Sequence, residues 1–269
     1  MHGVTTNIAV NGTTLGYDEA GSGSPVLLLH AGIADRRMWH GVRDALADRH
    51  RVICLDLRGY GDSALPPESF AHHDDVRAVL DALGIEQAAL AGCSFGGAVA
   101  IDTALAYPQR VSALALFGTA VSGHEWSEQT EELWDTLVGE VDEEDLAANA
   151  AGEVRFWVVG PYRRPEDLDP AFIAAAEESD RRALAAEQAL SAVDVVELDP
   201  PAIGRLGELR MPVLVTAGAV DIPDIIGLAD RIAAEAPDAH RLPDVPDAAH
   251  LVPLERPTPV ADALRAFLP

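Results

Sequence analysis

The string Gly92-Cys93-Ser94-Phe95-Gly96 places a glycine two positions before and two positions after a serine. The apolar run 88–91 predicts a buried strand before this string, and residues 98–107, rich in Ala, Ile and Leu, predict a helix after it. A serine on a sharp strand-to-helix turn needs small neighbours, because its backbone is strained and closely packed. Such a turn lifts the hydroxyl clear of the sheet and aims helix N-terminal amides at developing negative charge. We predict Ser94 as a nucleophile; the alternative is a glycine-rich connection that serves packing alone.

A serine hydroxyl needs a base to take its proton and an acid to orient that base. Among nine histidines, His250 lies in a loop after the last predicted strand, where the carboxyl ends of parallel strands gather functional groups. We therefore predict His250 as the base, with His124 as a lesser candidate. Asp221 follows the predicted strand 213–217 and is our choice for the acid, with Asp224 as its competitor. The alternative for either carboxylate is a turn residue or a cap of the helix that begins near 224.

An oxyanion formed on the substrate needs two amide donors. One is expected to be the N–H of Phe95, directly after the nucleophile. The other should come from the loop after an earlier strand, which points to residues 30–33, and we choose Gly32. A plain turn glycine is the alternative for Gly32, and His30 is expected to brace the loop.

The elements that position these groups follow from hydrophobic periodicity and turn residues. Asn11-Gly12 between two alternating stretches predicts a β-hairpin. Further strands are predicted at 26–30, 51–55, 88–91, 111–117, 212–217 and 240–242, and helices at 39–49, 70–83, 98–107, 224–235 and 259–268. Strands that alternate with helices imply an α/β fold, a mostly parallel eight-stranded sheet flanked by helices on both faces.

The alternation stops between residues 120 and 201, where the chain is helical and acidic. We expect this segment to be a helical cap inserted after the sixth strand, over one end of the sheet. The predicted domains are residues 1–119 and 202–269 for the two parts of the core and 120–201 for the cap.

Three tryptophans of the predicted cap, Trp126, Trp134 and Trp157, are candidates for substrate-binding residues. Binding pockets are mostly apolar with a few polar anchors, and this segment concentrates large aromatic side chains. The alternative is that they pack only the core of the cap itself.

The charge balance restricts the partners. Asp and Glu number 44 against 19 basic residues, all of them arginine, for a formal net charge of −25. Nucleic acids and anionic membranes attract basic patches, so we expect neither as a partner. No stretch is long and apolar enough to span a membrane, and residues 1–10 lack the features of a signal peptide. A cytoplasmic protein that acts on a small-molecule substrate is expected, in an oligomeric state that the sequence leaves open.

Neither a metal nor a cofactor is expected. In His72-His73-Asp74-Asp75 the neighbouring side chains point to different faces of a predicted helix, which suits a solvated helix start better than a metal site. No glycine-rich loop lies where it could bind phosphate or a dinucleotide. Cys54 and Cys93 fall in predicted buried positions, which favours two reduced thiols over a disulfide.

The chain resembles the α/β-hydrolase fold family over essentially its whole length. The matching strings are GCSFGG, HAGIADRRMW (30–39), DLRGYGDS (56–63), GAVD ending at Asp221 and AAHLVPLERP ending at Pro257. It looks closest to the capped branch of esterases, lactonases and C–C hydrolases that includes 3-oxoadipate enol-lactone hydrolase-like proteins. The sequence departs from the family pattern at Ala31 and Ala249, where glycine is usual.

The resemblance implies Ser94 as nucleophile, His250 as base, Asp221 as acid and the amides of Gly32 and Phe95 as oxyanion donors. Serine at the turn, rather than aspartate, argues against haloalkane dehalogenase and epoxide hydrolase chemistry. We expect a serine hydrolase that cleaves a small carboxylic ester or lactone through an acyl-enzyme on Ser94. The alternatives are a C–C bond hydrolase of a diketone-type substrate and a ligand-binding or biosynthetic member of the fold.

Overall fold

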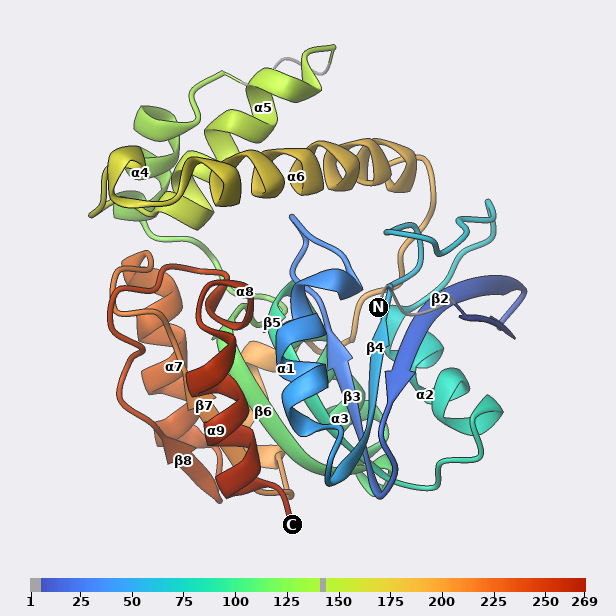
Figure 1. Cartoon of the computed structure of the whole chain (residues 1–269). Coiled ribbons are helices and arrows are strands. Elements are labelled where there is room, and N and C mark those ends of the chain that lie inside the picture. The colour runs from blue at the N-terminus through green and yellow to red at the C-terminus, as the bar shows by residue number, and fades with distance from the viewer. Residues whose placement is uncertain (1–5, 141–143) are drawn as a thin grey trace.

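The computed structural model describes residues 6–140 and 144–269. Eight strands form a single sheet in the order β1-β2-β4-β3-β5-β6-β7-β8 (Figure 1). Strands β1 and β2 pair antiparallel, β2 also pairs antiparallel with β4, and the remaining pairs are parallel. The strands are β1 (Thr6–Val10), β2 (Thr13–Ala20), β3 (Ser24–Leu29), β4 (His50–Leu55), β5 (Ala88–Ser94), β6 (Val111–Thr119), β7 (Val213–Thr216) and β8 (Ala239–Arg241). The predicted mostly parallel sheet is confirmed.

Alternating side chains of the central strands supply two cores, one on each face of the sheet. In β3, Leu27 and Leu29 pack on one face while Val26 and Leu28 pack on the other, and all four are buried. Because both faces are covered, the strand is a continuous apolar run rather than an alternating one.

Helices cover both faces, as predicted. Apolar side chains of α2 (His72–Ala82), α3 (Phe95–Ala106) and α7 (Pro223–Glu235) belong to one core. Those of α1 (His40–Leu46), α8 (Val252–Glu255) and α9 (Pro257–Phe267) belong to the other. The 3₁₀ turn η1 (Arg36–Trp39) leads into α1, so the helix predicted from residue 39 begins one residue later.

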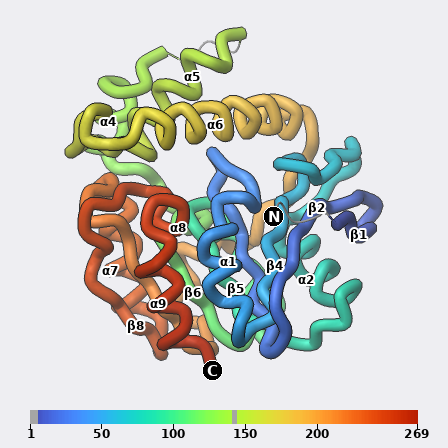
Figure 2. The backbone as a smooth tube through the Cα atoms, viewed as in Figure 1, coloured from blue at the N-terminus to red at the C-terminus, as the bar shows by residue number. Residues whose placement is uncertain are grey.

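A separate layer of helices connects β6 to β7. It contains α4 (Glu128–Leu137), α5 (Leu146–Glu153), the π-helical turn η3 (Val154–Val159) and α6 (Pro170–Leu190), which we call the helical layer. Figures 1 and 2 show α6 running across the sheet, with α4 and α5 beside it. The insertion thus follows the sixth strand, as predicted, while the domain limits at residues 120 and 201 remain a prediction.

Within the described residues, no helix combines the length and the apolar character that crossing a membrane requires. Cys54 and Cys93 are free thiols, and both are buried.

Candidate active site

The turn between β5 and α3 holds Ser94 in a backbone conformation that side-chain-bearing residues rarely adopt, with φ +52° and ψ −122°. Its glycine neighbours have steric reasons to be glycine. A Cβ on Gly92 would lie 2.4 Å from the carbonyl oxygen of Gly96, and a Cβ on Gly96 would lie 2.3 Å from that of Leu29. Backbone packed this closely leaves no room for a side chain, and strained residues of this kind cluster at functional sites.

His250 and Asp221 form a buried pair. The Nδ1 atom of His250 lies 2.9 Å from Oδ2 of Asp221, and each side chain is only 1% exposed. The other oxygen, Oδ1, accepts the amide N–H of Ile222 at 2.8 Å, which fixes the carboxylate in the turn after β7. With Nδ1 donating to a carboxylate, the imidazole carries its free lone pair on Nε2, the arrangement of a general base.

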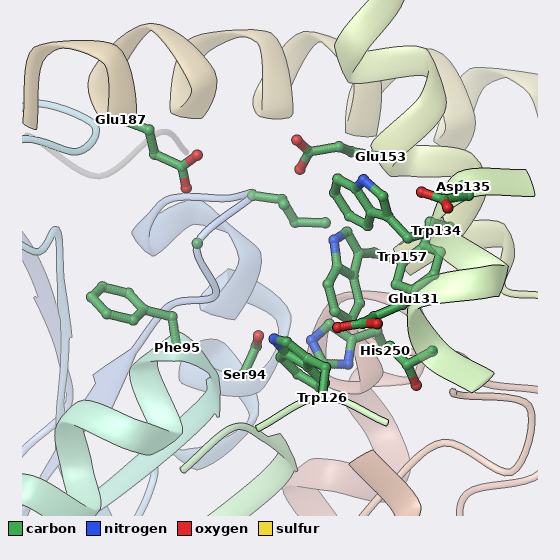
Figure 3. Close-up of a pocket in the computed structure, with 14 residues that line it drawn as sticks. Ser94, Phe95, Trp126, Glu131, Trp134, Asp135, Glu153, Trp157, Glu187 and His250 are labelled. Carbon is green, nitrogen blue, oxygen red and sulfur yellow. The ribbon is translucent and has the colours of Figure 1, made fainter. Parts of the chain in front are cut away.

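Ser94 and His250 line the same cavity, which has a volume of about 640 Å³. Figure 3 shows both side chains at its floor, beneath the side chains of the helical layer. The Nε2 atom of His250 is buried and has no hydrogen-bond partner within residues 6–140 and 144–269. An unpaired buried imidazole nitrogen beside a serine in one cavity is available to take a proton.

Trp157 holds the ring of His250 from the side of the helical layer. The two ring centroids are 4.4 Å apart with planes inclined by 34°, and the amide N–H of His250 donates to the carbonyl of Trp157 at 3.1 Å. Trp157 lies in the π-helical turn η3, a form of helix that often marks functional sites. This tryptophan therefore positions the histidine as well as lining the cavity.

The other two tryptophans also line the cavity, which places all three candidate substrate-binding residues around it. Trp126 is 41% exposed. Trp134 packs against Phe156 and Trp157 with ring centroids 5.1 and 6.4 Å away. The aromatic side chains therefore line the cavity and also pack against one another, and their role in substrate binding remains a prediction.

Gly32 and Phe95, whose amides are the predicted oxyanion donors, lie next to each other in the cavity lining. Both line the cavity, and a Cβ on Gly32 would lie 3.8 Å from that of Phe95. The loop that carries Gly32 is anchored by His30, whose Nε2 accepts the amide N–H of Leu57 at 3.0 Å. The expectation that His30 braces a loop is confirmed, because this bond joins the loops after β3 and β4.

The same two loops share an ionic anchor. The amide N–H of Arg36 donates to Oδ1 of Asp56 at 2.8 Å, while its guanidinium pairs with Asp18 at 3.0 Å and Asp62 at 2.7 Å. The strings around residues 30–39 and 56–63 thus hold one loop against the other.

Among the described residues, Asp224 hydrogen-bonds to Ser127, and not to His250 or to the first amides of its own helix. Its carboxylate accepts the amide N–H and the hydroxyl of Ser127, both at 2.9 Å. Burial opposes its ionisation, but hydrogen bonds from Thr130 and Ser127 outweigh that effect and hold its pKa below the ordinary value. Ser127 is the N-cap of α4, so Asp224 ties α7 to the helical layer instead of capping its own helix. The structure pairs Asp221, not Asp224, with His250. The lesser base candidate, His124, packs its ring against Trp126.

Sequence reasoning missed the acidic side chains of the cavity. Glu131 and Asp135 of α4, Glu153 of α5 and Glu187 of α6 all line it. Burial and the charge of Glu187 raise the pKa of Glu153 to about 7. An acidic helical segment ordinarily indicates a solvated surface, which hid these residues.

A signal for part of this set was present in α6. Buried residues of this helix recur at Ala176, Asp180, Ala183 and Leu184, and Glu187, which is exposed, continues that helical period. An acid on the apolar stripe of a helix, such as Asp180, indicates a buried carboxyl group.

Comparisons with known proteins agree with this geometry. The family model for the alpha/beta hydrolase fold matches residues 24–257. A 2-hydroxymuconate semialdehyde hydrolase from Pseudomonas sp. strain CF600 is 34% identical over 134 residues, which span 47% of this chain and 47% of that relative.

Solved structures match along nearly the whole chain. A thermophilic esterase from Thermogutta terrifontis has a TM-score of 0.77 at 27% identity and covers 98% of both chains. An enol-lactonase from Burkholderia xenovorans LB400 has the same TM-score at 24% identity, with 98% of this chain and 99% of that chain covered, a likeness of fold alone. The chain spans about half or less of the length of the curated relatives it matches, and by its family match this protein belongs to the α/β-hydrolase fold family.

Proposed function

We propose that this protein is a serine hydrolase that cleaves a small carboxylic ester or lactone, with Ser94, His250 and Asp221 as its catalytic triad. The observation that carries the proposal is the buried imidazole of His250. Its Nδ1 is held by Asp221, and its unpartnered Nε2 lies on the cavity that also contains the strained Ser94. The helical layer would act as the cap that closes this cavity and selects the substrate.

In the first half-reaction, Ser94 Oγ attacks the carbonyl carbon of the ester while His250 Nε2 takes its proton. Asp221 stabilises the imidazolium that results. The amides of Gly32 and Phe95 are proposed to hold the oxyanion, and each such donor contributes about 3 kcal/mol to the transition state. The imidazolium then protonates the departing alkoxide, which leaves as the alcohol, and the acyl group stays on Ser94.

In the second half-reaction, His250 Nε2 takes a proton from water and the hydroxide attacks the acyl carbon. Collapse of the second oxyanion releases the carboxylic acid, and the proton on His250 returns to Ser94 Oγ. A lactone follows the same steps, except that its alcohol stays attached to the acyl chain throughout, so the second half-reaction releases a single hydroxy acid.

A second candidate function comes from the curated relative, which is named for a hydroxymuconate semialdehyde. The lining of this cavity disfavours a carboxylate-bearing substrate of that kind, because it contains four acidic side chains and, among the described residues that form it, no arginine. Like charges at close range oppose binding. We therefore favour the ester or lactone.

The proposal is tested with a 4-nitrophenyl ester and a serine-directed fluorophosphonate probe. The wild type should release nitrophenol and bind the probe covalently. Ser94→Ala should lose the labelling and lower kcat by about a millionfold, the scale seen when a triad serine is removed. Ser112→Ala, which alters an exposed serine of β6, is the matched control and should retain both. Probe attachment to Ser94→Ala, confirmed as folded by circular dichroism, would refute the assignment.

A further inference from the structure

The cavity has an acidic wall opposite Ser94. In Figure 3, Glu153 of α5 lies beside the ring of Trp134, and Glu187 of α6 lies on the other side of the cavity, above Phe95. Oε1 of Glu187 lies 3.6 Å from the position of a Cβ on Gly32, so this carboxyl group sits next to the proposed oxyanion loop. A negative charge there would oppose the developing oxyanion unless a positive charge accompanied it.

A third carboxyl group stands behind this wall. Asp180 lies on α6 two turns before Glu187, so both point from the same face of the helix. It is only 1% exposed, and both of its carboxyl oxygens lack a hydrogen-bond partner among the described residues. Burial, aided by the charges of Glu153 and Glu187, raises its pKa to about 9.

Few groups among the described residues offset the negative charge of Glu187. Glu187 accepts one hydrogen bond, from Tyr60 Oη at 3.3 Å. Burial also raises the pKa of Glu187, and the Tyr60 hydrogen bond opposes that rise only in part. Buried carboxyl groups are costly unless a cation or several hydrogen bonds accompany them. The buried Asp180, unpartnered among the described residues, lies behind a wall that carries the half-buried Glu153 and the exposed Glu187, and this arrangement indicates that a positively charged ligand completes the site.

The wall suits an organic cation better than a metal ion. Within residues 6–140 and 144–269, no group of three His, Cys, Asp or Glu side chains has the arrangement to hold a metal. The cavity surface next to the carboxyl groups consists of aromatic rings, which attract alkylammonium groups through their π faces and offer apolar contact to their methyl groups.

We propose that Glu153 and Glu187, with Asp180 buried behind them, form a subsite for an alkylammonium group carried by the substrate, with Trp134 and Trp157 as its aromatic walls. This inference rests on the proposed function, because it places the cation on the ester that Ser94 attacks. Glu187 adjoins the oxyanion loop, so the cation is separated from the scissile carbonyl by a short aliphatic spacer. The substrate class is thus an amine-bearing ester or lactone.

Two esters of equal shape test the charge alone. They are 4-nitrophenyl 4-(trimethylammonio)butanoate and its neutral isostere, 4-nitrophenyl 5,5-dimethylhexanoate. The wild type should prefer the cationic ester by tenfold or more in kcat/KM, the effect of a desolvated cation on carboxylates and aromatic rings. Glu153→Gln should reduce this preference by about tenfold, and Glu187→Gln provides a second variant with the same expectation.

The matched control is Glu178→Gln, which removes an exposed charge on the same helix that pairs with Arg181 and Arg182. It should keep the preference of the wild type. Equal kcat/KM for the two esters in the wild type would overturn the inference, and so would a preference that survives both Glu153→Gln and Glu187→Gln.

A binding measurement separates this inference from the proposed function. Tetramethylammonium chloride is titrated into the wild type at constant ionic strength, made up with sodium chloride, while the fluorescence of the cavity tryptophans is recorded. A saturable change that Glu153→Gln weakens about tenfold supports the subsite even if no ester is hydrolysed. Hydrolysis of the neutral ester without a saturable response to tetramethylammonium would leave the proposed function standing and overturn the cation subsite.

Discussion

Replacing Asp180 with Asn should stabilise the protein, and more so as the pH rises. Asp180 is buried without a hydrogen-bond partner for its carboxyl group among the described residues, and its pKa is raised to about 9 from an ordinary value of 3.8. The groups that face it are Glu153 from α5, Glu187 from its own helix and Tyr60 from the loop after β4. Asparagine has the same shape and cannot ionise, so it removes the titration with little change in packing.

The sign follows from the protons bound in each state. Between the two pKa values the folded protein keeps a proton on Asp180 that the unfolded chain has lost, so unfolding releases a proton and rising pH favours it. The free energy of unfolding of the wild type therefore loses a little over 1 kcal/mol per pH unit from this residue. Between about pH 6 and pH 8, the advantage of Asp180→Asn should grow by up to about 3 kcal/mol.

The assay is urea unfolding followed by circular dichroism, at half-unit steps of pH and constant ionic strength. For a chain of this size the gain corresponds to an increase in Tm of roughly 5 to 10 °C at the upper end of the range. Glu178→Gln, on the exposed face of the same helix, should follow the wild-type curve. Parallel curves for Asp180→Asn and the wild type would show that Asp180 ionises normally in the folded state and would refute the reasoning.

The remaining predictions concern the triad, the aromatic wall and the net charge. Asp221→Asn should lower kcat by about 10⁴ with little change in KM, since Asp221 holds Nδ1 of His250. Asp224→Asn should keep kcat and lower Tm by loosening the Ser127 contact; steady-state kinetics and melting curves that gave the reverse pattern would reassign the acid. Trp157→Ala should lower kcat, because Trp157 contacts His250, and should alter the preference for acyl length in a series of esters, because Trp157 lines the cavity. Lower stability with an unchanged preference for acyl length would limit Trp157 to a packing role. Added sodium chloride should raise Tm, because salt screens the self-repulsion of a net charge of −25, and a flat or falling response up to molar salt would contradict this.

Much of the fold could be predicted because its signals are local. Asn11-Gly12 adopts positive φ at both positions, as the hairpin requires, and the apolar runs become the buried strands of the parallel sheet. The GxSxG string carries its own steric reason, since a Cβ on Gly92 or Gly96 would clash with a backbone carbonyl oxygen. The order of strands and helices then places the loops after β5, β7 and β8 near one another, which brought Ser94, Asp221 and His250 into consideration together.

Other features depend on contacts between segments far apart in the chain. The choice between Asp221 and Asp224 was open in the sequence, because both follow the same strand; the fold turns one toward His250 and the other toward Ser127. The contact of Trp157 with His250 joins residues 93 positions apart through a π-helical turn that no pattern in the sequence indicated.

The acidic wall shows the limit most clearly. The acidic character of a helix favours the solvated interpretation, and the place of Asp180 on the apolar stripe of α6 was a signal against it. Only the packing of α5 and α6 buries Asp180, half-buries Glu153 and raises the pKa of Asp180, Glu153 and Glu187. The sequence by itself therefore determined the fold and indicated the residues that we propose for catalysis, through local periodicity and sterics. The tertiary structure decided which charges are buried, and so what the cavity can bind, because desolvation is a property of the surroundings and not of the residue.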